Sequence, residues 1–382
     1  MEKYIVAGRL IDGSGGEIKK RTALVVDQGR IRDVIAAESL PSDRPEALID
    51  LSHCTLMPPL MDCSVDIARS PSIGKRQNSK KNDKERAAVL SRHIHFCHSH
   101  GVLGVADCAH GDDGCSTELI RDVDEAVTIR TANQVYHTGR HDKLTDVSES
   151  ADFVKIIHTD ATEAIGNREA DTVDAGNDNL LKLVRQASER GKQTVVVVNG
   201  NHGVAEALRA GCDAIEQGYD MGGENLEDMA SRKILWIPAL VRLKNHLEMA
   251  PSARKAEIAE QLKKQQSLLR QARSLGVPVA VGTGAGSNGI IHGESVLEEI
   301  KQLMKSGYSL VEALRAGSLI GAEFFKVPEI GILQSGSPAN FIVSRGMVQQ
   351  LPRKLSYLEN IYWHGDPSRW YRKNPVKTVS KN

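Results

Sequence analysis

The chain has 382 residues, of which 40% are hydrophobic and 26% are charged, and its 49 basic residues balance its 49 acidic ones. This length is enough for one large domain and a small one, with a hydrophobic core of ordinary size. A formal net charge of zero provides no basic field to attract nucleic acid or anionic lipid, so neither partner is expected.

The start of the chain and its cysteines favour a cytoplasmic protein. Residues Met1–Val6 contain no basic segment followed by an apolar run, so no signal peptide is expected. No apolar run approaches the roughly 18 residues of a membrane span. None of the six cysteines forms a Cys-x-x-Cys pair, which is typical of buried free thiols in a reducing compartment.

Two kinds of segment follow one another along the chain. Short runs of strand character, separated by turn residues, fill the first sixty positions and include 4–6, 23–26 and 31–35. From there to about residue 325, apolar strand-like runs alternate with amphipathic helical runs. The strand-like runs of this part are 60–65, 103–106, 127–130, 153–157, 194–198, 213–215, 234–238 and 277–281.

Helical periodicity is strongest between these strand-like runs, at 82–99, 179–190, 204–210, 253–275 and 295–305. Near-continuous apolar strands that alternate with helices predict a parallel sheet covered by helices. Eight such units fit a closed barrel better than an open sheet. Strand character returns after residue 330, at 332–333 and 339–343.

Four groups of motifs, each weak by itself, occur in one order along the chain. They are Leu10–Gly13 with Asp27–Ile31, Ile49–Asp62, Ala210–Gly218, and Gly282–Ala285 with Leu310–Ala316 and 331–341. In this order and spacing, the chain resembles the metal-dependent amidohydrolase superfamily over essentially its whole length. The resemblance implies an α/β fold: a (β/α)8 TIM-like barrel over residues 59–330, and a small β-sandwich built from residues 1–58 and 331–382.

The same resemblance implies an active site at the C-terminal mouth of the barrel. There the family holds metal ions that activate a water for attack on an amide or related carbon. The family's ligands are two histidines after strand 1, a lysine or acid on strand 4, histidines after strands 5 and 6, and an aspartate after strand 8. Such nitrogen and oxygen donors suit zinc-like ions.

This chain departs from that ligand pattern at almost every position. The replaced positions carry Ser64, Asp66, Val197, Gln217 and Gly284. Only Lys155, on the predicted fourth strand, has the expected residue type. Hydroxyl and amide groups are poor ligands for a divalent ion, and valine and glycine side chains supply none, so no metal site is expected. The glycine also cannot act as the general base that the family's aspartate provides.

Lys155 and Asp66 remain as the candidate catalytic residues. One interpretation is a carbamylated Lys155 that bridges two metal ions, but those ions have lost their other ligands. The sequence favours a strand-end lysine paired with Asp66 or Asp107 across the mouth. Asp66 as a lone metal ligand is a less favoured alternative. Asp62 is expected to make structural hydrogen bonds at the end of its strand.

Further polar residues near predicted strand ends are expected to line a pocket at the mouth. They are Ser64, Asp107, His110, His137, His158, Asn199, Gln217 and Thr283. An alternative is a rebuilt metal site in which loop histidines, His292 among them, surround Asp66 and Asp107. Loop histidines without a metal are nevertheless common at barrel mouths. Cys63 and Cys108 are interpreted as buried thiols rather than nucleophiles.

Two functional hypotheses follow from these observations. In the first, the chain is a degenerate amidohydrolase without a cofactor that binds a small molecule at the barrel mouth, as a ligand-binding, regulatory or assembly protein. In the second, it is an active hydrolase of non-peptide C–N bonds that uses Asp66, Lys155, a loop histidine and a zinc-like divalent ion. A weaker third hypothesis is a metal-free lyase or isomerase with Lys155 as base, its pKa lowered by burial. A homo-oligomer is expected by analogy alone.

Overall fold

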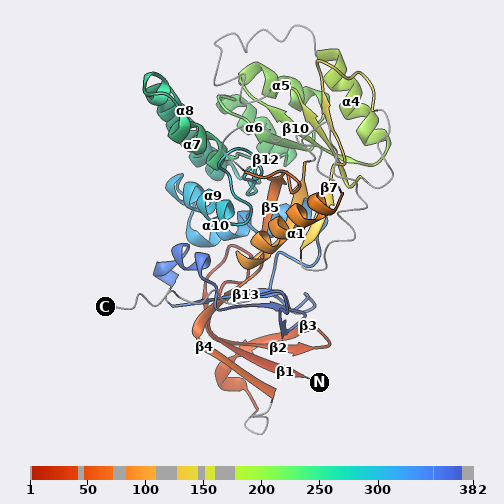
Figure 1. Cartoon of the computed structure of the whole chain (residues 1–382). Coiled ribbons are helices and arrows are strands. Elements are labelled where there is room, and N and C mark those ends of the chain that lie inside the picture. Colours follow the sequence, from red (N-terminus) through yellow and green to blue (C-terminus); the bar gives the residue numbers. More distant parts are fainter. Residues whose placement is uncertain are drawn as a thin grey trace, which may run out of the picture.

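The structure is a computed structural model that describes residues 2–41, 47–71, 83–108, 127–144, 151–159, 177–346 and 348–371. Figure 1 shows a sheet built from both ends of the chain, next to a set of strands surrounded by helices. The predicted α/β fold, a TIM-like barrel with a small β unit formed by both ends of the chain, is confirmed.

The β unit is one seven-stranded sheet that folds back on itself. Its strands, in spatial order, are β15 (Asp366–Pro367), β14 (Asn360–Trp363), β13 (Phe341–Arg345), β4 (Leu48–Met57), β1 (Lys3–Leu10), β2 (Lys19–Asp27) and β3 (Arg30–Ala36). The edge strand β3 meets the residues before β13, because Ile31 N donates to Ser337 O (2.8 Å) and Ala339 N to Gly29 O (2.8 Å). The folded sheet encloses a hydrophobic core of its own around Phe341.

The barrel strands pair in parallel with their neighbours. One sheet contains β5 (Leu60–Val65), β6 (Val102–Asp107) and β7 (Thr128–Thr131); the other contains β8 (Val135–His137), β9 (Phe153–Ile157), β10 (Gln193–Val198), β11 (Ala214–Gln217) and β12 (Leu235–Ile237). Every residue of β5 and β6 is buried, as expected for strands covered on both faces. β7 corresponds to the predicted strand 127–130, whereas β8 was not predicted and follows a break near Asn133, where φ is +60°.

Residues 277–285, which include the predicted strand 277–281, close the barrel. Trp236 N of β12 donates to Pro278 O (2.9 Å), and Cys63 N of β5 donates to Val281 O (2.8 Å). Isolated bridges form here in place of a regular strand. Proline has no N–H to give to the ladder, and the glycines that follow weaken extended pairing.

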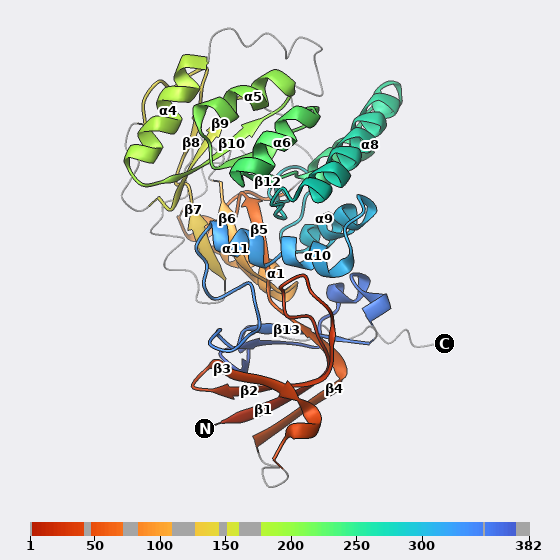
Figure 2. The same ribbon diagram turned by 180° about the vertical axis from the view of Figure 1, so that it is seen from behind.

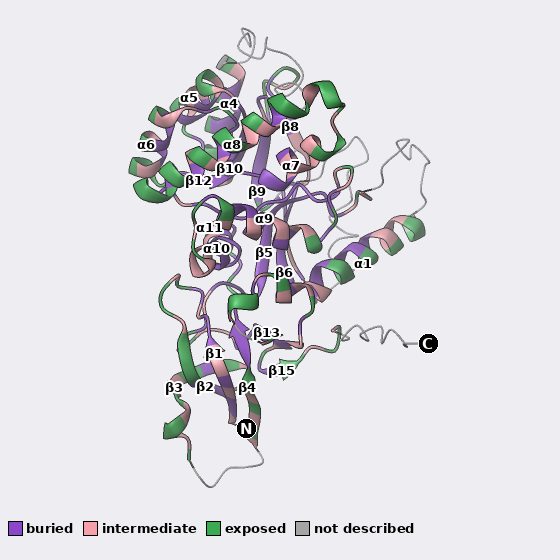
Figure 3. Ribbon diagram, turned by 90° about the vertical axis from the view of Figure 1, so that its left-hand side faces the viewer, coloured by how far each residue is buried: buried purple, intermediate pink, exposed green. Residues whose placement is uncertain are grey.

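Helices cover the outside of the barrel (Figure 2). In the described residues they are α1 (Asp83–Ser99), α4 (Asn177–Glu189), α5 (Asn201–Ala210), α6 (Gly223–Arg232), α7 (Leu240–Met249), α8 (Ser252–Leu275), α9 (Glu294–Lys305), α10 (Leu310–Ala316) and α11 (Leu319–Phe324), with 3-10 helices η1 (Ala37–Ser39), η3 (Val348–Gln350) and η4 (Arg353–Ser356). Figure 3 shows buried barrel strands inside helices that are exposed on their outer faces. Among the described helices, none has the length and apolar character that crossing a bilayer requires.

A buried carboxyl group links two of the outer helices. Glu299 of α9 has no exposed surface, and its two oxygens accept hydrogen bonds from Leu240 N (2.9 Å) and Val241 N (2.6 Å) at the start of α7. These N–H groups belong to the first turn, so they have no acceptor within their own helix. Burial raises the pKa of Glu299 from 4.5 to about 8, although both hydrogen bonds lower it.

We expect the pH dependence of stability to reveal this carboxyl group. Because the folded chain keeps the Glu299 proton between pH 4.5 and about 8, where the unfolded chain loses it, the free energy of unfolding falls as pH rises through this range. Glu299→Gln removes that contribution. Glu299→Ala leaves two N–H groups without an acceptor and lowers the free energy of unfolding by about 2–4 kcal/mol. Urea unfolding at both ends of the range measures these effects, and an equal pH slope in the wild type and Glu299→Gln contradicts the assignment.

Candidate functional site

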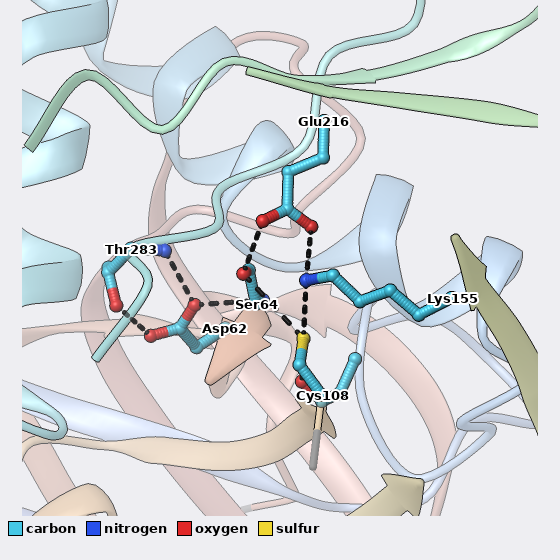
Figure 4. A network of polar contacts seen from close by, with 7 residues as sticks. Asp62, Ser64, Cys108, Lys155, Glu216 and Thr283 are labelled. Atoms are coloured by element: carbon cyan, nitrogen blue, oxygen red, sulfur yellow. Dashed lines mark hydrogen bonds and ion pairs between the residues drawn. The ribbon is translucent and has the colours of Figure 1, made fainter. Parts of the chain in front are cut away.

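Four buried polar side chains converge near the C-terminal ends of the barrel strands. Ser64 comes from β5, Cys108 from the residue after β6, Lys155 from β9 and Glu216 from β11 (Figure 4). Lys155 Nζ donates to Glu216 Oε2 (2.7 Å) and to Cys108 Sγ (2.8 Å). Ser64 Oγ donates to the second carboxylate oxygen, Glu216 Oε1, at 2.8 Å. We call these four residues the lysine network.

The register of the strands brings Lys155 and Glu216 together. β10 lies between their strands, with Val195 opposite Lys155 and Val197 opposite Glu216. The two charged residues are therefore offset by two positions along β10, as expected for inward-facing residues of tilted barrel strands. Their side chains are 0% and 2% exposed. A charge at that depth requires a partner of opposite sign.

The contacts of Lys155 fix its protonation state. Burial alone lowers its pKa, but the contacts with Cys108 and Glu216 outweigh burial and raise the pKa above its ordinary value. Burial raises the pKa of the Cys108 thiol to about 12, so this thiol stays protonated at neutral pH. The Glu216 carboxylate therefore favours the ammonium form of Lys155 and does not support a lysine base with a lowered pKa.

The partner of Lys155 differs from the prediction. Lys155 pairs with Glu216, and not with Asp66 or Asp107. The Asp107 carboxylate is engaged elsewhere, because it accepts hydrogen bonds from Ile67 N (2.9 Å) and from the hydroxyl of Thr131 (3.3 Å). Sequence reasoning missed Glu216, although a signal exists: it is the one charged residue in an otherwise uncharged buried strand, and such a residue needs a partner in another strand.

Asp62 fastens the closing segment of the barrel to β5. Its Oδ1 accepts hydrogen bonds from Thr283 N (2.8 Å) and Ser64 N (3.2 Å), and its Oδ2 accepts one from the Thr283 hydroxyl (2.5 Å). Burial raises the pKa of Asp62 to about 7. The predicted structural hydrogen bonds of Asp62 are confirmed, and Thr283, a predicted pocket residue, is one of its donors.

Asp66 belongs to a second buried cluster. His292 Nε2 lies 2.9 Å from Asp66 O, and the His292 ring stacks on that of His93 with 4.1 Å between centroids. Burial, with Asp107 adding to it, raises the pKa of Asp66 to about 7, and burial lowers the pKa of His292 to about 4. Asp66 Oδ2 and His292 Nδ1 are buried without a hydrogen-bond partner. The two candidate catalytic residues, Asp66 and Lys155, thus lie in different clusters.

Three more predicted pocket residues form local pairs near the strand ends. Asn199 Nδ2 donates to Gln217 Oε1 at 2.6 Å, while Gln217 Nε2 is buried without a partner. His158 Nδ1 lies 3.1 Å from the Thr138 hydroxyl, and its Nε2 lies 3.1 Å from Glu206 Oε2. These contacts hold the side chains against one another.

The remaining predicted positions supply few polar side-chain contacts at the barrel mouth in the part of the chain that the structure describes. His137 lies half-buried at the end of β8, and His110 falls outside the described residues. Val197 is buried in β10 and has no polar side-chain atom. Gly284 N donates to Ser64 O (2.8 Å), and its φ of +70° lies in the left-handed region that favours glycine.

The donor atoms that the structure describes around Lys155 do not fit a divalent cation. In the part of the chain that the structure describes, no three His, Cys, Asp or Glu side chains come together in a way that holds a metal ion. The Ser64 hydroxyl is bonded to Glu216, and the Gln217 oxygen accepts from Asn199. The ammonium group of Lys155 has no lone pair to donate.

Comparison with known protein sequences gives a family match and distant relatives. A model of the amidohydrolase family matches residues 129–362, more than half of the chain. An uncharacterized protein of Mycobacterium tuberculosis is 28% identical over 146 residues, which cover 37% of this chain and 39% of the relative. The chain therefore matches about two fifths of the length of such curated relatives.

Solved structures share the fold over nearly the whole chain. A Xaa-Pro dipeptidase with bound methionine is 21% identical, with 96% of this chain and 100% of that chain covered and a TM-score of 0.79. The ochratoxinase of A. niger is 17% identical, with 96% and 95% covered and a TM-score of 0.78. Molinate hydrolase is 16% identical, with 97% and 95% covered and a TM-score of 0.75. At these identities the likeness concerns the fold.

A double-mutant cycle tests the lysine network. Lys155→Met leaves the buried Glu216 carboxylate without its counter-ion and is expected to lower the free energy of unfolding by about 3–5 kcal/mol. Lys155→Met combined with Glu216→Gln removes both charges, so the double variant is expected to be more stable than the sum of the single changes predicts. Urea unfolding measures all four proteins.

The exposed Lys182 provides the matched control, because Lys182→Met removes a lysine charge from a solvated surface and is expected to change stability by less than about 0.5 kcal/mol. Single changes of Lys155 and Glu216 that add up within about 0.5 kcal/mol would contradict the ion pair.

Proposed function

Since the chain belongs to the amidohydrolase family, we propose that it keeps the family's barrel but binds a small molecule at the mouth without metal-dependent hydrolysis. In this proposal the protein is a ligand-binding, regulatory or assembly member of the family. The ligand is a small polar compound with a carbonyl group.

The observation that carries the proposal is the pairing of Lys155 with Glu216. A lysine at this position of the family serves as a metal ligand when its amine is neutral or carbamylated. Here Lys155 Nζ lies 2.7 Å from a buried carboxylate, which keeps it an ammonium ion. An ammonium ion neither reacts with carbon dioxide nor donates a lone pair to a cation.

The remaining ligand positions support the same conclusion. Val197 and Gly284 carry no donor atom, and the Gln217 oxygen is already bonded to Asn199. The position of the family's general base is Gly284, which cannot move a proton. Hydrolysis by the family's route therefore lacks both the means to activate water and the means to transfer its proton.

Unpartnered polar atoms near the strand ends support a bound ligand. Gln217 Nε2 is a buried donor without an acceptor, and Asp66 Oδ2 is buried without a donor. Buried polar groups without partners are unfavourable, so a ligand that accepts from Gln217 Nε2, or one that pairs with Asp66 Oδ2, would stabilise the mouth. An amide group offers both functions, and one of the solved relatives is a dipeptidase, which makes dipeptides suitable first probes.

A second candidate function is a hydrolase of C–N bonds with a rebuilt metal site around Asp66. It is favoured by the burial of Asp66 Oδ2 and His292 Nδ1 without partners, because both are atoms that bind zinc-like ions.

Metal analysis and melting of untagged protein distinguish the two functions. We expect well below one equivalent of zinc, iron or manganese, no change in melting temperature on addition of a chelator, and a higher melting temperature with dipeptides or other small carbonyl compounds. The rebuilt site would instead be supported if the wild type holds one equivalent of metal and hydrolyses a C–N bond. Both properties should then be lost in Asp66→Ala and kept in the exposed control Asp142→Ala.

A further inference from the structure

A cavity of about 810 Å³ lies at the opposite end of the barrel from the lysine network. Its lining includes Leu235, the first residue of β12, and residues 277–279, where the closing segment begins. These are the N-terminal ends of the parallel strands, whereas Lys155 and Glu216 lie toward the C-terminal ends. The cavity is therefore separate from the mouth and from the function proposed for it.

The walls of this cavity combine apolar surface with positive charge. Apolar side chains from the strands and from α11 include Leu235, Val279, Ile320 and Phe324. The loop after β1 adds Gly15, whose Cβ, if present, would lie 2.9 Å from Arg315 Cδ. This loop reaches up from the β unit toward α10 and α11 (Figure 2). A cavity of this size and character suits a small organic molecule.

Of the three cations at the wall, only Arg273 forms an ion pair with the described residues. Lys233, Arg273 and Arg315 face two carboxylates, Glu312 and Glu323, so the lining carries one excess positive charge. Glu312 is engaged by Arg273 Nε, at 2.9 Å and 3.1 Å from its two oxygens. The guanidinium group of Arg315, half-buried in α10, forms no ion pair with the described residues.

Two hydrogen-bond donors in the same wall have no acceptor. Arg315 Nε and Tyr308 Oη are buried without a hydrogen-bond partner. Burial raises the pKa of Tyr308, so its hydroxyl keeps the proton and remains a donor. A buried donor that lacks an acceptor destabilises the protein, which a bound acceptor would relieve.

We propose that this cavity binds a small organic anion, whose acidic head group accepts hydrogen bonds from Arg315 and Tyr308 and whose apolar body lies against Leu235 and Phe324. Because both donor atoms are buried when no ligand is bound, the side chains of Arg315 and Tyr308 turn toward the head group when the ligand binds. A bidentate carboxylate or phosphate matches the fork of donors on a guanidinium group.

Titration calorimetry of the full chain with three probes tests the proposal. Octanoate and octyl phosphate carry an anionic head on the same apolar body, and octanol carries a neutral one. We expect one molecule of octanoate or octyl phosphate to bind per chain, and octanol to bind at least about tenfold more weakly, because charge-assisted hydrogen bonds are lost. Equal affinity for octanol, or no binding of either anion, would overturn the proposal.

Variants place the binding at this cavity. Arg315→Gln is expected to weaken binding of the anions at least about tenfold, whereas Arg209→Gln, a change of an exposed arginine on α5, leaves it unchanged. Tyr308→Phe removes a donor that has no partner, so it is expected to fold as stably as the wild type and still bind the anions more weakly. Unchanged affinity in both Arg315→Gln and Tyr308→Phe contradicts the site.

Discussion

One buried positive charge, and the carboxylate that neutralises it, determine what the centre of this barrel can be. An ammonium ion at zero exposure is stable only with an opposite charge at hydrogen-bond distance, so Lys155 and Glu216 depend on each other. Ser64 donates to the second oxygen of Glu216, and Cys108 accepts a hydrogen bond from the ammonium group. The network carries no net charge, and it offers a cation neither a free carboxylate nor a neutral nitrogen atom.

The fold was predictable from the sequence because buried parallel strands have a composition of their own. Apolar runs such as 60–65 and 194–198 could be placed without a structure, and they form β5 and β10. Strand β8, which follows the break at Asn133, and the irregular closing segment were not predicted. They depend on single backbone conformations and on one proline, to which hydrophobic periodicity is not sensitive.

The candidate site was only half predictable. Replacement of the family's ligand residues could be read directly from the sequence, as at Val197 and Gly284. The partner of Lys155 could not, because it depends on which residues of neighbouring strands share an inward layer, and strand register is set by tertiary structure. For the same reason, sequence alone did not separate Asp66, in its cluster with His292, from the lysine network.

The left-handed backbone at Gly284 limits how this scaffold can change over generations. Most side chains at a φ of +70° are strained by about 1–2 kcal/mol, although aspartate tolerates this region better than most residues. It would gain nothing in return while Val197 and Gln217 supply no metal-binding partner. An aspartate at this one position therefore builds no metal site by itself, because the other ligand positions would have to change with it. Restoring the family's ligand pattern on this scaffold thus requires coordinated substitutions on several strands, whereas a change of binding specificity can begin with one side chain.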